Sequence, residues 1–375
     1  MILRKLPSRK TRRKLTKSER AERAAGWLFV SPVLIILGIF LVAPIFMALW
    51  VSVSDWAGRG SPFSSNVSFI GAQNFKQVLV DGGLSTRNFG TALRNNIYYV
   101  ILVVPIQTFV ALVLAVFVSN RALKARSFFR LAFYFPSITS SVAITVLWLF
   151  LFSVSGAVNQ VLGWFSLNGP NWFNDPRGLL HLLLGVFGVH TPPAALTSGT
   201  FLGITYWDWL AGPSIAWSAF ILMAVFTTSG TFMLLFIAAL QQINGEVQEA
   251  AMMDGANSFQ RFRFVTVPML KPTIFTVVTL GLIGTWQVFD QIYASGDPGA
   301  PARTTLTPAY LSYESAFISN RWGEGAAISF ILFAIIVLMA AIQRWALRDK
   351  DEAKLRRRIR KQKRVEARAT KKGAN

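Results

Sequence analysis

The 375-residue chain contains no cysteine and only two histidines, His181 and His190. The absence of cysteine excludes disulfides and thiolate metal sites, and two imidazoles are too few for a histidine-rich metal centre. Charged residues make up only 15% of the chain. The dipeptide Gly-Lys, which a phosphate-binding GxxxxGK[ST] loop needs, does not occur. We therefore expect no bound metal, no cofactor and no ATP hydrolysis by this chain.

Apolar residues, in contrast, make up 53% of the chain. A membrane span needs roughly 20 mainly apolar residues to cross a hydrocarbon core of about 30 Å. Six segments meet this condition: Trp27–Trp50, Ile97–Val118, Phe128–Phe152, Ile215–Leu240, Thr273–Ala294 and Ala326–Trp345. The sequence thus predicts an all-α membrane protein with about six transmembrane helices. Pro136 lies within the third segment and should kink that helix, because proline removes one backbone hydrogen bond.

The net charge of +21 is concentrated at the two ends of the chain. Residues 1–25 carry ten Lys and Arg, and residues 344–375 carry fourteen. With both termini cytoplasmic, 31 of the 38 basic residues lie on the inner side, as the positive-inside rule requires. We therefore predict a membrane domain at 26–345 between cytoplasmic basic tails at 1–25 and 346–375. The tails set the topology and can bind anionic membrane lipid; nothing in them indicates nucleic-acid binding.

An enlarged external loop, residues 153–214, separates the third and fourth predicted spans. Within it, the apolar stretches Leu179–Val189 and Ala194–Ile204 are separated by Pro192-Pro193. Runs this short are more often interfacial than spanning, so we favour a surface-lying or periplasmic helix pair. The alternative, that both stretches cross the membrane, would give eight spans with an otherwise unchanged topology. We expect both histidines, which lie in this loop, to be structural.

A polar, helix-forming loop, residues 241–271, separates the fourth and fifth predicted spans on the cytoplasmic side. Asn244 is a candidate N-cap, and Gly255 can adopt the positive φ that turns a chain at a helix end. We also expect Ser258 to cap a second helical segment, and Pro268 to lie in a turn that enters the fifth span. The pattern indicates a short helix, a sharp turn and a second helix that returns to the membrane.

The order of residues in this loop is specific. Glu249-Ala250-Ala251, then Asp254-Gly255-Ala256, then Val265, Val267 and Pro268 resemble the EAA signature of permease subunits in ABC importers. The chain is most similar to the carbohydrate-uptake branch, which includes maltose and glycerol-3-phosphate permeases, over most of residues 26–345. It departs from the family at Ser295-Gly296-Asp297-Pro298, where a threonine and a glycine pair usually precede the proline.

The resemblance implies a type I ABC importer permease fold in a prokaryotic cell membrane. It also implies four partners outside this chain: two ATPase subunits, a second homologous permease and an extracytoplasmic solute-binding protein. The loop would be the ATPase-coupling element, with Glu249, Ala250, Ala251, Asp254, Gly255 and Pro268 as its site residues. ATP binding in the partner would then drive alternating access of the spans.

Residues for the solute pathway are harder to choose. Trp286 and Asp290 are four residues apart and should share one helix face, with Gln287 beside them. We name these three as candidates, and Tyr98 and Gln107 as further polar or aromatic positions within spans. Interfacial aromatics and interhelical hydrogen bonds are the alternative explanation. The absence of basic residues in mid-span favours a neutral sugar, but the cargo itself cannot be read from the sequence.

Other classes of protein fit less well. An ion-coupled secondary transporter is the main alternative, although the predicted spans contain no paired acidic residues or histidine relay. A membrane scaffold or receptor would not need the 241–271 loop. A membrane enzyme would need a nucleophile–base or metal constellation, which the sequence does not offer.

Overall fold

The computed structural model describes residues 16–120 and 123–346, and most of both basic tails lies outside these residues. Within the described part, five helices are long and apolar enough to cross a membrane, or six if one bent pair counts as a span. This agrees with the prediction of about six. The five are α1–η1–α2 (Lys17–Leu37, Gly38–Val42, Ala43–Ser52), α4 (Leu84–Ser119), α11 (Ile215–Gln241), α15–α16 (Lys271–Trp286, Asp290–Tyr293) and α18 (Trp322–Ala346).

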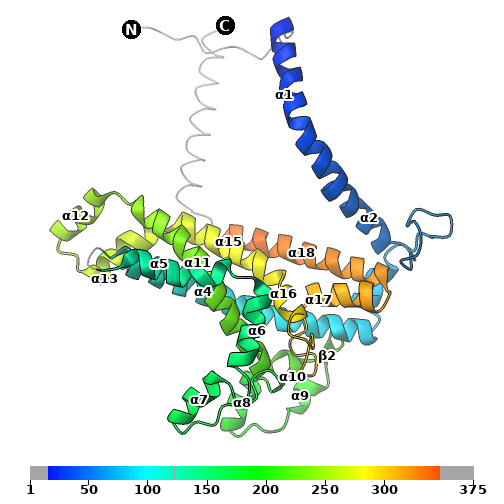
Figure 1. Cartoon of the computed structure of the whole chain (residues 1–375). Helices are drawn as coiled ribbons and strands as arrows, with labels where there is room; N and C mark the ends of the chain where they lie inside the picture. Colours follow the sequence, from blue (N-terminus) through cyan, green and yellow to red (C-terminus); the bar gives the residue numbers. More distant parts are fainter. Residues whose placement is uncertain (1–15, 121–122, 347–375) are drawn as a thin grey trace, which may run out of the picture.

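The first span stands away from the rest of the chain (Figure 1). Its most apolar 18-residue window has no residue buried against the described parts of the chain, and Phe29 and Phe40 are 85% and 76% exposed. Its last part, α2, packs against a neighbouring span, α18. An apolar helix of this length is stable only in lipid or against another membrane protein.

The centre of the bundle is the pair α4 and α11, which pack along much of their length. Trp217 of α11 is fully buried; its ring stacks on Tyr99, with centroids 4.8 Å apart, and its Nε1 donates to the carbonyl of Asn95. Helix α4 begins at Leu84, about thirteen residues before the predicted start of the span. The segment 84–96, which lies outside the predicted span Ile97–Val118, is thus also helical, and its Phe89 and Ala92 extend the buried face of α4.

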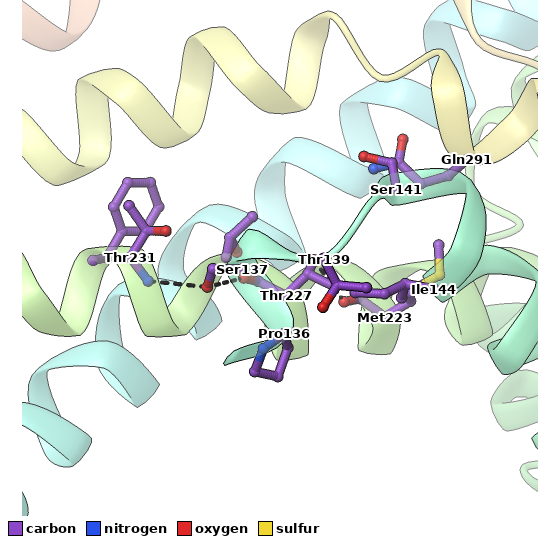
Figure 2. A pocket seen from close by; sticks show the side chains of 11 residues that line it. Pro136, Ser137, Thr139, Ser141, Ile144, Met223, Thr227, Thr231 and Gln291 are labelled. Carbon is purple, nitrogen blue, oxygen red and sulfur yellow. Dashed lines mark hydrogen bonds between the residues drawn. The ribbon is translucent and has the colours of Figure 1, made fainter. Parts of the chain in front are cut away.

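The third predicted span is not one helix. It consists of α5 (Arg126–Ile138) and α6 (Ser141–Leu151), bent by 100°. The break follows Pro136 by three residues, at Thr139 and Ser140, whose ψ angles of 147° and 133° are extended. Figure 2 shows how α5 is held: Ser137 donates to the carbonyl of Thr227 on α11 and accepts from the N–H of Thr231. The kink expected from Pro136 is thus present, but it is a complete interruption of the helix.

Segment 153–214 forms a small cap of short elements: α7 (Ala157–Trp164), α8 (Leu179–Val186), α9 (Ala194–Thr197), the hairpin β1 (Thr200–Phe201) with β2 (Ile204–Thr205), and α10 (Tyr206–Trp209). Helix α8 has eight residues and at 1.5 Å per residue is too short to span. The second predicted helix, Ala194–Ile204, is wrong, because only its first four residues are helical and the hairpin follows.

Side chains from α4 and α8 hold this cap in place. The backbone carbonyls of Trp207, Asp208 and Trp209, at the end of α10, each contact one of these side chains. Arg94 donates to Asp208 and Tyr98 to Trp209, while Nε2 of His181 lies 3.1 Å from the carbonyl oxygen of Trp207. The carbonyls of Trp207 and Asp208 also accept from the backbone N–H groups of Leu210 and Ala211, so these side-chain contacts add to the bonds that close the end of α10. His181 therefore has the structural role expected of it.

The remaining elements lie at the two ends of the bundle. One end has α3 (Gln73–Leu79), α17 (Pro308–Tyr313) and η3 (Glu314–Ile318). Here Glu324, at the start of α18, is 3% exposed; it forms an ion pair with Arg321 at 2.6 Å and accepts from Ser85 and Ser315. The opposite end has α12 (Gly245–Met253), α13 (Ser258–Arg261), η2 (Phe262–Thr266) and α14 (Val267–Met269).

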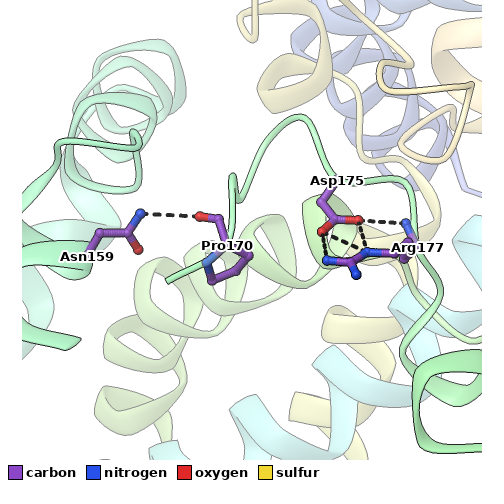
Figure 3. A network of polar contacts seen from close by, with 4 residues as sticks. All are labelled: Asn159, Pro170, Asp175 and Arg177. Carbon is purple, nitrogen blue, oxygen red and sulfur yellow. Dashed lines mark hydrogen bonds and ion pairs between the residues drawn. The ribbon is translucent and has the colours of Figure 1, made fainter. Parts of the chain in front are cut away.

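An ion pair between Asp175 and Arg177 (Figure 3) holds the segment of the cap that bonds to the start of α11. The guanidinium of Arg177 donates three hydrogen bonds to the buried carboxylate of Asp175, at 3.0, 3.1 and 2.6 Å. The carbonyl of Arg177 accepts from the N–H of Ile215, and the carbonyl of Asp175 accepts from the N–H of Ala216. These two N–H groups have no partner within their own helix. The side-chain hydrogen bonds from Arg177 lower the pKa of Asp175 below its usual value.

We therefore predict that Asp175→Asn speeds hydrogen exchange at the amides of Ile215 and Ala216 at pH 7. Because the folded pKa is lowered, the carboxylate stabilises the cap above the unfolded pKa, about 3.9. That contribution disappears as the pH falls through the folded value. The difference between wild type and variant should thus begin to shrink near pH 4 and vanish only below the lowered pKa of Asp175 in the folded protein. As a control, Asp81→Asn, which breaks only a 4.0 Å surface pair with Lys76, should leave these amides unchanged.

Candidate coupling loop and solute cavity

The 241–271 loop folds as a helix, a tight turn and a second helix. Asn244 caps α12 by accepting from the N–H of Glu246, as predicted. Gly255 has φ +78°, the conformation expected at this turn. Ser258 is not the second cap. Asn257 takes this position in a capping box with Gln260, and their two hydrogen bonds are both 2.8 Å.

The second part of the loop is helical almost without interruption. Helix α13 continues through η2 into α14, and Pro268 lies in the first turn of α14. This corrects the expected turn at Pro268: its ring tolerates this position because the first turn needs no N–H donor. The chain then passes Leu270, which is 1% exposed and packs in the core with α11 residues. The loop is thereby joined rigidly to α15.

The outer part of the loop protrudes from one end of the bundle (Figure 1). Helix α12 packs mainly against α13 and η2 of its own loop. Glu249, Ala250, Asp254 and Gly255 are exposed and Ala251 is half-buried. Apolar side chains share this surface, and Met253 is 88% and Phe259 72% exposed. We call this outer part of the loop, α12 with the turn at Gly255 and the start of α13, the knob. Its small residues and adaptable methionines are suited to fit into a groove of another protein.

The fifth span is also interrupted. Helix α15 ends at Trp286, and α16 begins at Asp290. Trp286 and Asp290 therefore do not share a helix face, which corrects that prediction. Trp286 is 2% exposed and packs with Val100 and Leu282 in the core. Gln287 and Asp290, in contrast, line a cavity of about 350 Å³ between α4, α11 and the interruption.

The cavity is also lined by Gln107, a further candidate from the sequence, and by Thr228, which the sequence did not indicate. Gln107 of α4 is 1% exposed; its Oε1 accepts from Thr228 at 2.6 Å, and its Nε2 has no partner within the described residues. Gly281 makes room for this amide, because a side chain at that position would collide with Nε2. Gln107 was a further candidate from its place in an apolar span. Tyr98 is not part of the cavity, since its hydroxyl bonds to the cap.

The described residues that line the cavity do not form a metal-binding site. Within residues 16–120 and 123–346, no three His, Cys, Asp or Glu side chains lie close enough to hold a metal ion. Besides Asp290, the polar side chains that line it carry amide and hydroxyl groups. Such groups bind a neutral, polyhydroxylated molecule by hydrogen bonds without having to neutralise a charge.

Comparison with known proteins identifies the family. Residues 82–350 match the family described as binding-protein-dependent transport system inner membrane component. The chain belongs to this family. Together with the membrane-length helices, this makes it a multi-pass membrane permease in a transport system, and not a catalytic subunit.

Relatives extend along nearly the whole permease. The lactose transport system permease LacF of Rhizobium radiobacter is 29% identical over 329 residues, covering 87% of this chain and 94% of that protein. The arabinooligosaccharide permease AraP of Halalkalibacterium halodurans is 28% identical, with 86% and 87% covered. MsmF, a multiple sugar-binding transport system permease of Streptococcus mutans, is 28% identical, with 85% and 93% covered.

Solved structures show the same fold. A bacterial ABC transporter for the acidic polysaccharide alginate matches with a TM-score of 0.64 at 18% identity, covering 88% of this chain and 97% of that one. A second structure of a bacterial alginate transporter, in complex with a pentasaccharide-bound periplasmic protein, gives 0.63 at the same identity, with 88% and 96% covered. The architecture is therefore that of an ABC importer permease.

Proposed function

We propose that this permease imports a neutral saccharide across a prokaryotic cytoplasmic membrane, driven by a separate ATPase. The exposed knob of the 241–271 loop carries this proposal. It is rigidly connected to α11 on one side and to α15 on the other, and both helices line the solute cavity. A force applied to the knob would therefore move two walls of the cavity together, which is the basis of alternating access.

The partners follow from the same features. An ATPase would receive Glu249, Ala250, Ala251, Asp254 and Gly255 in a surface groove. Pro268 would hold the returning helix in line with α15. A second permease and membrane lipid would together cover the exposed first span. A solute-binding protein would deliver the saccharide at the external cap, as the family description and the sugar-transport relatives suggest.

The choice of a saccharide is supported by the relatives and by the chemistry of the cavity. Gln107, Thr228, Gln287 and Asp290 offer both donors and acceptors, and the rings of Tyr99 and Phe289 add apolar faces. Trp286 would pack behind this wall of the cavity and would not contact the saccharide, since it is buried in the core.

This assignment predicts that Asp290→Asn raises the KM for saccharide uptake about tenfold, because a charge-assisted hydrogen bond is replaced by a neutral one. Uptake of labelled saccharide into cells that lack other routes would measure it. Asp297→Asn is the matched control, since Asp297 is exposed and outside the cavity. Equal KM values for wild type and Asp290→Asn would remove Asp290 from the binding site.

A further inference from the structure

The cap and the half-span that leads into it are almost free of charge. Between residues 131 and 207, the only Asp, Glu, Lys or Arg residues are Asp175 and Arg177, and these two form an ion pair with each other at 2.6 Å. The shorter segment 52–96, between the first two predicted spans, carries six such residues. Soluble domains contain about 25% charged residues. The composition of the cap therefore favours an apolar environment over water.

Two groups of apolar side chains project from the cap, and we call them the apolar tips. Trp164 and Phe165, where α7 ends, are 78% and 72% exposed. Val186 and Phe187, where α8 ends, are 83% and 82% exposed. Apolar surface that is exposed to this extent marks a site of contact with a membrane or with another protein.

The apolar surface of the tips continues onto α6, the second half of the interrupted third span. Val142, Val146 and Phe150 are spaced four residues apart, so they share one face of this helix, and they are 52%, 56% and 71% exposed. Figure 1 shows α6 leading away from the long helices, with the cap lying to one side of them. The tips thus extend the outer face of a membrane helix sideways from the bundle.

The residue types in the tips fit lipid better than a protein partner. A protein interface is normally surrounded by a polar rim, whereas the charged residues of the cap between 153 and 207 are limited to one internal ion pair. Tryptophan and other aromatic side chains are enriched at the level of the lipid headgroups. Helix α8, with eight residues, is too short to span but can lie in the interface with its apolar side in the acyl region.

We propose that the apolar tips of α7 and α8 insert into the outer leaflet of the bilayer and anchor the cap at the membrane surface. The sequence favoured a surface-lying helix at Leu179–Val189, but it did not indicate a second tip on α7 or which side chains enter the lipid. The partner is the lipid itself, so the proposal holds for any solute and any energy source.

An anchored α8 would act directly on the transport domain. The backbone N–H groups of Leu179 and Leu180, at the start of α8, donate to the carbonyls of Pro213 and Ala211 at 2.9 and 3.1 Å. These two carbonyls lie immediately before α11, which begins at Ile215. Lipid contact at the far end of α8 would therefore fix the depth in the membrane at which α11 begins.

The absence of native cysteine allows a direct test with single-cysteine variants. Val186→Cys is labelled with bimane and placed, with its co-purified subunits, in phosphatidylcholine liposomes that contain or lack brominated lipid. The wild-type complex gives the background labelling of the other subunits. We expect brominated lipid to quench the label at position 186, and also the label in Trp164→Cys on the other tip. Ser65→Cys is the matched control, because Ser65 is exposed in the charged segment 52–96, where iodide should quench and brominated lipid should not.

Quenching by brominated lipid decides the proposal. If the labels at positions 186 and 164 keep their fluorescence in brominated lipid, the tips do not enter the bilayer and the proposal is overturned. Iodide then shows what surrounds them: quenching by iodide would place the cap in water, and protection from both quenchers would show that another subunit covers the tips. Either result would leave the proposed transport function unaffected.

Discussion

Gly255→Pro is expected to abolish ATP-driven uptake and to release the ATPase from the purified complex. Gly255 has φ +78° at the end of α12, whereas proline fixes φ near −65°. Its N–H, which donates to the carbonyl of Met252, would also be lost. The turn must then open, and the knob can no longer present α12 in the same orientation. We expect the amount of co-purified ATPase to fall more than about tenfold, which is a loss of at least roughly 1.4 kcal/mol of binding free energy.

The same loop offers a matched control. Gly245 is the first residue of α12, follows the N-cap Asn244 and has open space around it. Proline is favourable at this position, and Asn244 already has the extended conformation, ψ 129°, that a following proline requires. Gly245→Pro should therefore retain the ATPase and transport. Loss of function in both variants, or in neither, would show that the turn at Gly255 is not what the ATPase recognises.

A substitution at Gly230 is expected to change the stability of the permease. Gly230→Ala is expected to destabilise the permease, although glycine to alanine within a helix is normally stabilising by roughly 0.5–1 kcal/mol. Gly230 lies on α11 where α5 crosses it. A methyl group there would collide with the carbonyl oxygen of Phe133, and would lie 2.7 Å from Oγ of Ser137 and 2.9 Å from Cα of Tyr134. Overpacking against backbone costs about 1–3 kcal/mol.

A comparison with Gly38→Ala isolates this effect. Gly38 lies in the helical first span, and a methyl group added there would have no atom of the described residues within 4 Å. Thermal unfolding in detergent should give a midpoint several degrees lower for Gly230→Ala and an unchanged or slightly higher one for Gly38→Ala. If the two variants unfold at the same temperature, α5 and α11 do not pack as closely as described.

The long apolar runs predicted most of the fold, because roughly 20 consecutive apolar residues have few alternatives to a membrane helix. The 241–271 loop was also largely predictable, since Asn244 and Gly255 act through local backbone geometry. Ser258 was assigned wrongly because Asn257, one residue earlier, completes a better capping box with Gln260.

The solute cavity was harder to predict, because it depends on where helices stop. Pro136 signalled a disturbance in the third span, but the 100° break also depends on the hydrogen bonds of Ser137 to α11. No proline marks the end of α15 at Trp286, so a continuous helix was assumed and Trp286 was placed on the wrong surface. The hydroxyls of α11 looked like ordinary helix residues, and only the packing of two interrupted spans brings them together.

The proposed function requires that a partner ATPase, and not an ion gradient, energises this permease. The most direct measurement is saccharide uptake into proteoliposomes that contain the permease with its co-purified subunits, with the binding protein outside and ion gradients collapsed by ionophores. We predict uptake that requires enclosed ATP and is insensitive to the ionophores. Uptake without ATP that follows an imposed sodium or proton gradient would contradict this claim and identify a secondary transporter.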